Sequence, residues 1–388
     1  MSKVPAGWVN IFLGTIAKNI TSGSRDWSKY YSDVGDKFVR MTNLNRDGIH
    51  LLVDNMKYVN VVSSSRDGER TSLEYGDVLI SITAELGKIG WVPEGFGKAY
   101  INQHTALLRF NNELIDSKFI AYQLSSPRLN KIINSLNDAG AKSGLNLSTI
   151  RNIPIIICPL YEQTKIAQIL STWDKAIATT EKLIGNSQQQ KKALMQSLLT
   201  GKKRLPGFEG EWTETTLGEI SKPQQWSTIT SSQLTPAGFR VYGANGFIGY
   251  YSEYNHELEC VTVTCRGSTC GEVSLIPRKS YITGNSMCLD DIEPSINAYR
   301  YIYYSLSYRG FDDVISGSAQ PQIVGSAIKK IKVKLPPLPE QQKIAAVLTA
   351  ADNEIELLQK KLAFLKQEKA ALMQQLLTGK RRVKVEAA

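Results

Sequence analysis

The sequence predicts an α+β protein in which two strand-rich globular domains are separated by two long helices. One observation is an internal repeat: Glu162–Ile177 resembles Glu340–Ile355, and Leu194–Lys202 resembles Leu372–Lys380, each pair with an offset of 178 positions. The other is that the region before each copy carries short β-branched runs between glycine-rich turns, which is typical of strands. Together they indicate a pseudo-two-fold repeat of globule, helix, globule and helix.

The repeat divides the 388-residue chain into four segments, a length that also favours more than one core. The expected segments are a first globular domain over 1–160, a first long helix over 161–203, a second globular domain over 204–338, and a second helix with a basic tail over 339–388. A weaker similarity opens each half, because Trp8 and its following Leu-Gly match Trp212 and its Leu-Gly with an offset of 204. The globular domains have therefore diverged in length.

Each globular domain is expected to contain one buried strand and one helix that can be placed from the pattern of apolar residues. The expected strands are 77–83 and 260–265, the expected helices are 119–136, with a break at Pro127, and 299–306, and a turn is expected at 87–90.

In the repeated segments, apolar residues alternate by four and three positions for more than four heptads, which predicts a coiled-coil seam. The seam residues are Ile166, Leu170, Trp173, Ile177, Ile184, Leu194 and Leu198 in the first copy, and Ile344, Leu348, Ile355, Leu358, Leu362, Leu365, Leu372 and Leu376 in the second. We expect an antiparallel pair with Ile166 opposite Leu376, spanning roughly 50 Å. The alternative is that each helix packs on its own globule.

Composition places the chain in broad classes only. A net charge of +10 points towards a polyanionic partner. Five cysteines, an odd number, favour a reducing compartment over a disulfide scaffold, and no secretory signal or 18-residue apolar stretch is present, so a cytoplasmic location is expected.

The motifs of catalysis are missing from the sequence. It contains neither a phosphate-binding loop, nor G-x-G-x-x-G, nor the proline-rich signature of adenine methyltransferases. The three histidines are scattered, and the five-residue spacing of Cys260, Cys265 and Cys270 is not that of a zinc site, so buried apolar roles are favoured for these cysteines. We therefore expect no catalytic residue, no metal ligand and no cofactor in this chain.

Polar loops next to the predicted strands are candidates for contacting DNA, because arginine can pair with guanine, and asparagine or glutamine with adenine, through two hydrogen bonds. Segment 1–160 carries a net charge of +4, but 205–338 carries −2, so contacts there must come from a local patch. The candidates are Arg40, Thr42, Asn43, Lys88, Gln103, His104, Lys142 and Asn146 in the first domain, and Tyr242, Asn245, Arg266, Ser268, Thr269, Asn285, Gln320 and Gln322 in the second.

The chain resembles the specificity subunit of type I restriction–modification systems over essentially its full length. The resemblance rests on the duplicated E-Q-x-K-I-A at Glu162 and Glu340 and on the duplicated L-L-T-G-K at Leu198 and Leu376. The junction 204–218 adds to it, and Val241–Gly249 and Arg266-Gly267 look like family motifs in the second domain. The first domain has Ser81-Ile82-Thr83 where the second has Cys265-Arg266-Gly267.

This resemblance implies that each globular domain reads one half of an asymmetric bipartite site in double-stranded DNA. The helices would set the spacing and dock two modification (methyltransferase) subunits, which bind S-adenosylmethionine, while restriction subunits use ATP and magnesium for translocation and cleavage. Two other hypotheses stay open: a non-catalytic coiled-coil adapter that binds only proteins, and an enzyme whose site has no recognisable motif.

Overall fold

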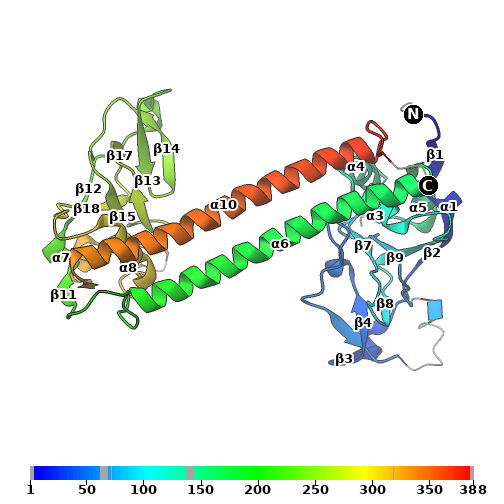
Figure 1. Ribbon diagram of the computed structural model, residues 1–388, viewed down its shortest axis with the longest axis horizontal. Helices are drawn as coiled ribbons and strands as arrows, with labels where there is room; N and C mark the ends of the chain where they lie inside the picture. The colour runs from blue at the N-terminus through cyan, green and yellow to red at the C-terminus, as the bar shows by residue number, and fades with distance from the viewer. Residues whose placement is uncertain (1–3, 62–68, 71, 137–143, 318, 385–388) are drawn as a thin grey trace. The chain divides into compact units, whose positions relative to one another are not determined.

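The protein is described by a computed structural model that covers residues 4–61, 69–70, 72–136, 144–317 and 319–384. Two compact units are present: Met1–Thr179 with Leu362–Ala388, and Thr180–Lys361. The two longest helices are α6 (Leu160–Leu198) and α10 (Leu338–Leu376), of 39 residues each (Figure 1). Each of them is divided between the two units, α6 after Thr179 and α10 after Lys361. The repeated sequence therefore forms the two longest helices, each beginning close to its predicted start.

The first unit is built around two four-stranded sheets, with the orders β2-β9-β6-β7 and β3-β5-β4-β8, and a two-stranded pair β1-β10. Its strands are β1 (Val9–Phe12), β2 (Ala17–Ser22), β3 (Tyr31–Ser32), β4 (Asp36–Val39), β5 (Lys57–Val59), β6 (Val78–Ser81), β7 (Ile89–Trp91), β8 (Ala99–Ile101), β9 (Thr105–Phe110) and β10 (Pro154–Ile157). Its shorter helices are α1 (Leu13–Ile16), α3 (Ser117–Ser125), α4 (Pro127–Ser135) and α5 (Leu147–Arg151), with 3₁₀ turns η1 (Trp27–Tyr30) and η2 (Met41–Asn43).

The second unit has sheets with the orders β12-β18-β15-β16 and β14-β13-β17, and a pair β11-β19. Its strands are β11 (Thr213–Thr216), β12 (Lys222–Gln225), β13 (Phe239–Gly243), β14 (Gly246–Tyr251), β15 (Cys260–Thr264), β16 (Val273–Ile276), β17 (Ser280–Ile282), β18 (Ser286–Asp290) and β19 (Lys332–Leu335). Its shorter helices are α7 (Leu217–Ile220), α8 (Tyr299–Arg309) and α9 (Gly325–Lys329), with η3 (Ser231–Gln233).

The main sheets of the two units share one topology. In each sheet, the strand that comes first in the sequence (β2 or β12) pairs with the strand that comes last (β9 or β18), which in turn pairs with β6 or β15. Every residue of β6 and β15 is buried. A short strand buried on both faces is rich in β-branched and apolar residues, as in Val-Leu-Ile-Ser of β6 and Cys-Val-Thr-Val-Thr of β15, and this is why both strands were predictable from sequence. The parallel pairs β4-β8 and β13-β17 complete the correspondence.

One local prediction needs correction and another is confirmed. The turn predicted at 87–90 ends before Ile89, because Ile89 and Gly90 belong to β7. A side chain at Gly90 would collide with Leu51 and Leu44, so the glycine lets these two leucines pack closely against β7. The predicted break at Pro127 is present: Pro127 opens α4, and the Ser126 hydroxyl accepts a hydrogen bond from the backbone of that helix.

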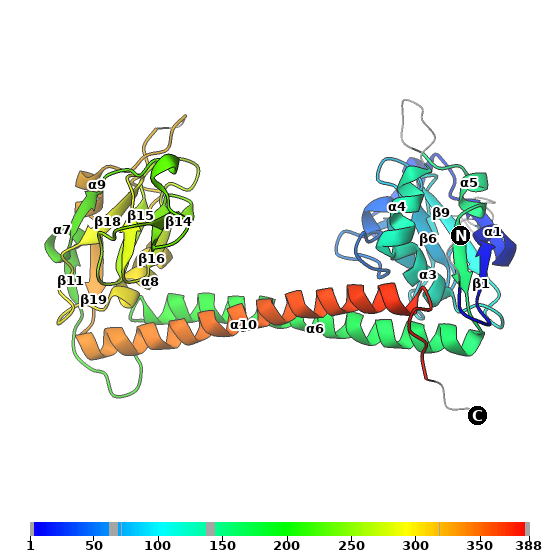
Figure 2. The ribbon, with the colours of Figure 1, turned by 90° about the horizontal axis from the view of Figure 1, so that it is seen from above.

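Each globule packs through its helices against the two long helices. In the first unit, α3 contacts β6 and β7 and lies next to the ends of α6 and α10 (Figure 2). Ile166 and Leu170 of α6 join Met373 and Leu376 of α10 in the same core. In the second unit, Leu198 of α6 and the segment 344–348 of α10 pack against α8. The long helices therefore contact both each other and a globule, and the two packing alternatives occur together.

Ion pairs show that α6 and α10 run antiparallel within each unit. In the first unit, Lys369 Nζ lies 2.5 Å from Asp174 Oδ1, and the Tyr122 hydroxyl donates to the other oxygen of Asp174 at 2.5 Å. In the second unit, Lys191 lies 2.5 Å from Asp352, which also accepts a hydrogen bond from Tyr304 at 2.7 Å. Lys369 stands 178 positions after Lys191, and Asp352 stands 178 positions after Asp174, so the two ion pairs are copies of each other. In the first unit α10 supplies the lysine and α6 the aspartate, and in the second unit the roles of the helices are reversed.

The glutamates that open the repeat have the same reciprocal arrangement. Glu162 is 1% exposed and pairs with Arg382 at 2.5 Å, and Glu340 is 0% exposed and pairs with Arg204 at 2.5 Å. The basic residues that follow one helix therefore neutralise the start of the other.

The predicted seam residues are all buried or half-buried, whereas Leu183, Leu357 and Phe364 on the same helices are exposed. None of the helices in the described part of the chain combines the length and the apolarity needed to cross a membrane.

Candidate nucleic-acid interface

In the second unit, the predicted contact residues gather where the chain leaves β15. The Ala244 carbonyl, in the turn between β13 and β14, accepts a hydrogen bond from Thr264 Oγ1 at 3.2 Å. The neighbouring Asn245 Oδ1 accepts one from Thr269 Oγ1 at 3.3 Å. These bonds join the turn of the hairpin to the loop that contains Arg266.

Two further segments join the same loop through backbone hydrogen bonds. Cys265 N donates to the Asn285 carbonyl at 3.0 Å, and the Cys265 carbonyl accepts from Ile323 N at 3.0 Å. Arg266 also forms an antiparallel bridge with Gln322. Four segments that lie far apart in the sequence therefore meet at one place.

This meeting point, here called the second loop cluster, consists of 242–245, 266–269, 285 and 320–322. The side chains of Asn245, Arg266, Ser268, Asn285, Gln320 and Gln322 are exposed, and those of Tyr242 and Thr269 are half-buried. Gly267 has a φ of +93°, a conformation that side-chain-bearing residues rarely adopt, and it turns the chain directly after Arg266. The cluster offers hydrogen-bond donors and acceptors on a framework tied together by backbone bonds.

Sequence reasoning missed apolar residues beside this cluster. Phe247 and Ile248 of β14 are 50% and 41% exposed, and Arg240 of β13 is exposed as well. An exposed aromatic ring next to polar groups can stack on a base or enter a groove of DNA. The signal that could have found them is the hairpin turn itself, whose outermost residues are exposed.

The first unit repeats the same backbone arrangement with other side chains. Ile82 N donates to the His104 carbonyl at 3.0 Å, Leu145 N donates to the Ile82 carbonyl at 2.9 Å, and Thr83 bridges to Gly144. These bonds place Thr83 where the second unit has Arg266, and His104 where it has Asn285. The sequence comparison of Ser81-Ile82-Thr83 with Cys265-Arg266-Gly267 was therefore wrong by one residue. Ala84, with a φ of +57°, takes the place of Gly267.

Thr83, Gln103 and His104 line a polar pocket of about 780 Å³. The residues that line this pocket are here called the first loop cluster. The Gln103 amide lies 3.1 Å from His104 Nε2, and Thr83 Oγ1 lies 2.8 Å from Nδ1, so both ring nitrogens have protein partners. The pocket is also lined by Arg25, Lys29 and Arg70, which the sequence analysis did not select. Arg25 and Lys29 lie on one segment together with Asp26, whose carboxylate offsets part of their charge. Arg70 joins them from a distant segment, and its guanidinium donates to Ser24 Oγ at 2.7 Å.

Several predicted residues have other roles. Asn43 is 1% exposed; its amide donates to the Leu52 carbonyl at 2.8 Å and its oxygen accepts from Arg40 N at 3.0 Å. It holds a turn together and has no surface with which to contact DNA, so its assignment as a contact is corrected. Arg40 is half-buried and donates to the Asn55 carbonyl at 3.0 Å, while the adjacent Thr42 is exposed.

Two more predicted residues of the first domain, Lys88 and Asn146, are not among those that line this pocket. Lys88 forms an ion pair with Glu85. Asn146 is exposed, but its side-chain oxygen caps α5 by accepting from Thr149 N at 2.8 Å. Lys142 lies outside the described residues.

Known proteins are similar to this chain over most of its length. The family model for the type I restriction modification DNA specificity domain matches residues 5–186 and 209–367. A putative type I restriction enzyme MjaX specificity subunit from Methanocaldococcus jannaschii is 26% identical over 420 residues, which cover 99% of this chain and 96% of that protein. The EcoprrI specificity subunit of Escherichia coli is 27% identical over 150 residues, 37% of each chain.

Solved structures with the same fold include the S subunit of a type I restriction–modification system from M. genitalium. Its TM-score is 0.68 at 17% identity, with 97% of each chain covered. Because the family model matches most of the sequence in two copies, one for each globule, the chain belongs to the family of type I restriction–modification DNA specificity subunits.

Proposed function

We propose that this chain is the non-catalytic subunit that gives a type I restriction–modification complex its DNA sequence specificity. Each globular domain, 1–160 and 204–338, reads one half of an asymmetric bipartite site through its loop cluster. The observation that carries this proposal is the equivalent backbone arrangement of the two clusters with different side chains, Thr83 and His104 in one and Arg266 and Asn285 in the other. Equivalent frames with different donors and acceptors suit two unlike half-sites.

The chemistry of the second cluster favours direct reading of bases. An exposed arginine can donate two hydrogen bonds to guanine, and exposed asparagine or glutamine can pair with adenine. Serine and threonine hydroxyls suit phosphate oxygens, which position a protein on the duplex without reading its sequence. In the first domain, the cations Arg25, Lys29 and Arg70 supply charge for the phosphate backbone.

We further propose that α6 and α10 form an antiparallel coiled coil that sets the distance between half-sites and docks two modification subunits. Equivalent grooves support two docking sites. One, of about 480 Å³, is lined on α6 by Thr164, Gln168 and Ser171 among others, and another, of about 520 Å³, is lined on α10 by Gln342, Ala346 and Thr349. Each of these α10 residues stands 178 positions after its α6 counterpart. S-adenosylmethionine, ATP and magnesium then belong to the partner subunits.

The test is to map methylated adenines in DNA of the source cell, and then to measure binding of the purified complex with modification subunits to that sequence. We expect tight binding to the mapped bipartite site and weak binding to scrambled DNA. Affinity for scrambled DNA should fall steeply as salt rises, because phosphate contacts release counterions. Equal affinity for both sequences, or no dependence on salt, would favour the protein-only adapter.

Replacing Arg266 with alanine should weaken recognition of one half-site only. Loss of a two-bond contact to a base costs about 1–3 kcal/mol, or roughly a 5- to 150-fold loss of affinity. Competition binding with every single-base substitution of the site should show relaxed preference at one position of the second domain's half-site. Arg278→Ala is the matched control, since Arg278 is an exposed arginine of the same domain outside the cluster. Equal losses for both variants would show that Arg266 contributes only charge.

A further inference from the structure

Four side chains that could hold a metal ion converge in the second unit, apart from the loop cluster. They are His256, Cys260, Cys288 and Asp290, and their ligand atoms all lie within 4.8 Å of one another. Cys288 and Asp290 are two positions apart on β18, so their side chains leave the same face of the strand. Since Thr262 pairs with Cys288 in the antiparallel β15–β18 ladder, Cys260 lies beside Asp290 on the neighbouring strand.

The orientation of His256 is fixed by its neighbour Asn255. The Asn255 amide donates to the Ile282 carbonyl at 2.9 Å, and its oxygen accepts from Ile282 N at 2.8 Å. That oxygen also lies 2.7 Å from His256 Nδ1, so Nδ1 must carry a proton and donate it. The other ring nitrogen, Nε2, consequently points at Asp290 Oδ1, 2.9 Å away.

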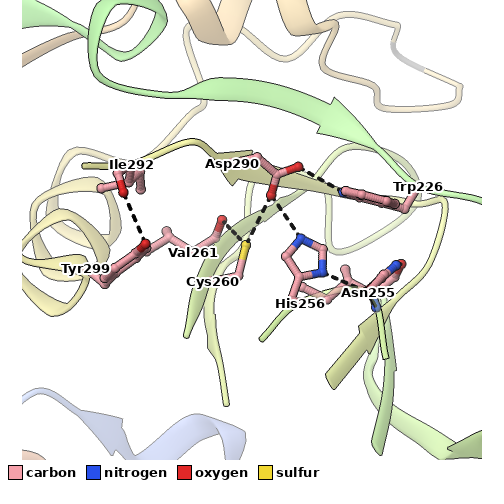
Figure 3. Close-up of polar contacts among 9 residues, drawn as sticks. Trp226, Asn255, His256, Cys260, Val261, Asp290, Ile292 and Tyr299 are labelled. Atoms are coloured by element: carbon pink, nitrogen blue, oxygen red, sulfur yellow. Dashed lines mark hydrogen bonds and ion pairs between the residues drawn. The ribbon is translucent and has the colours of Figure 1, made fainter. Parts of the chain in front are cut away.

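The Asp290 carboxylate is held in the same way. Its second oxygen accepts a hydrogen bond from Trp226 Nε1 at 2.9 Å, while Oδ1 faces His256 and lies 4.0 Å from Cys260 Sγ (Figure 3). With Nδ1 already protonated, Nε2 next to a carboxylate oxygen needs a second proton or a cation between the two.

We propose that His256, Cys260, Cys288 and Asp290 bind one structural zinc ion in tetrahedral geometry. One nitrogen, one oxygen and two sulfur ligands form a set that favours zinc over magnesium or calcium. Zinc bonds of about 2.0–2.3 Å place tetrahedral ligand atoms roughly 3.3–3.8 Å apart, so small side-chain rotations complete the site. Asn255 and Trp226 are the outer partners that such ligands require, one for the histidine and one for the carboxylate.

The surroundings fit a structural site that an ion can enter. Cys260 and Cys288 are 3% and 0% exposed, while a pocket of about 350 Å³, lined by His256, Asp290 and Trp226, leads to the cluster. Four protein ligands leave no open position, which is the arrangement of structural rather than catalytic zinc. The ion would tie the loop that carries His256 to the central strands β15 and β18.

The local spacing of the cysteines predicted no metal ligand. The residues that converge are His256 and Cys260, then Cys288 and Asp290 from a strand almost thirty positions later, and only the pairing of β15 with β18 brings them together. Cys265 belongs to a different contact, since its thiol lies 2.9 Å from the Gln225 amide. Cys265 is also 1% exposed and packs within the apolar core of the second unit, so the buried role predicted for the cysteines fits this residue.

The experiment measures metal content in the complete chain, purified with modification subunits under reducing conditions and without added metal. We expect about one zinc per chain, which a Cys288→Ser variant loses and a Cys265→Ser variant keeps. Exchange with Co²⁺ should give the thiolate-to-cobalt charge-transfer absorption in wild type and in Cys265→Ser only. A chelator should lower the melting temperature of wild type.

Wild-type protein that contains no zinc and takes up neither Zn²⁺ nor Co²⁺ would overturn the proposal, whatever the variants do. Mass spectrometry that finds a Cys260–Cys288 disulfide in the same preparation would overturn it as well. Because the readout is metal content, either result would leave the proposed DNA specificity untouched.

Discussion

Inserting four residues into both long helices, after Lys182 and after Lys360, should lengthen the preferred DNA spacer by about two base pairs and leave both half-sites unchanged. Four helical residues add about 6 Å, and a base pair of B-form DNA rises about 3.4 Å. The two insertion points are 178 positions apart, and contacts such as Lys191 with Asp352 place them opposite each other in an antiparallel pair. The paired insertion thus keeps both sets of ion pairs while adding length.

The measurement is a binding series over sites that differ only in spacer length, checked by methylation mapping in cells. The control replaces the exposed lysines at the two insertion points with arginine, Lys182→Arg and Lys360→Arg, without changing length, and should keep the original spacer. An insertion in α6 alone should weaken binding at every spacer, because one helix would be mismatched to the other. Altered half-site sequences, or an unchanged spacer, would show that the helices do not set the distance.

The long helices were predictable because the pattern of apolar residues that specifies them lies within one continuous stretch of sequence. A 3.5-residue period is visible in the sequence, and placing Ile166 opposite Leu376 puts Lys369 beside Trp173, one residue from the Asp174 that it contacts. Asp174 itself was not predictable as a partner, because it lies next to the apolar seam rather than in it. The buried strands β6 and β15 were found for the same local reason.

The interface was only partly predictable, since residues were selected by type and flanking pattern. That selection found Arg266 and Asn285, which the fold brings together, and also Asn43, whose amide serves the backbone instead. Whether an asparagine faces solvent or a turn depends on contacts with distant segments. Arg25 and Arg70 of the first loop cluster were missed for the converse reason, because their convergence exists only in three dimensions.

Replacing Asp174 with asparagine should destabilise the first unit by about 3–5 kcal/mol, the usual cost of leaving one charge of a buried ion pair without its partner. The side chains of Lys369 and Asp174 are only 7% and 9% exposed, so water cannot replace the lost contact. The equivalent Asp352→Asn is the matched control. Lys191 and Asp352 are 22% and 37% exposed, so solvent screens that pair and its loss should cost about 1 kcal/mol or less.

The dependence on pH separates charge from packing. Burial raises the pKa of Asp174, but hydrogen bonds from His50 and the attraction of Lys369 outweigh it and lower the pKa overall. A carboxyl whose pKa is lower in the folded state stabilises the fold above its unfolded value, about 3.9, and loses that contribution as pH falls through the folded value. Wild type should therefore lose stability below about pH 4 in part through this group, and Asp174→Asn should lack that part of the loss.

Denaturant unfolding of both variants, followed at neutral and acidic pH, measures these differences. The double variant Asp174→Asn with Lys369→Met should recover much of the loss, because it removes the unpaired ammonium and keeps an apolar stem in the seam. If the double variant is as unstable as Asp174→Asn, the cost lies in altered packing around Tyr122 rather than in an unpaired charge. If Asp174→Asn and Asp352→Asn lower the free energy of unfolding equally, then the deeper burial of the Lys369–Asp174 pair does not strengthen it relative to the Lys191–Asp352 pair.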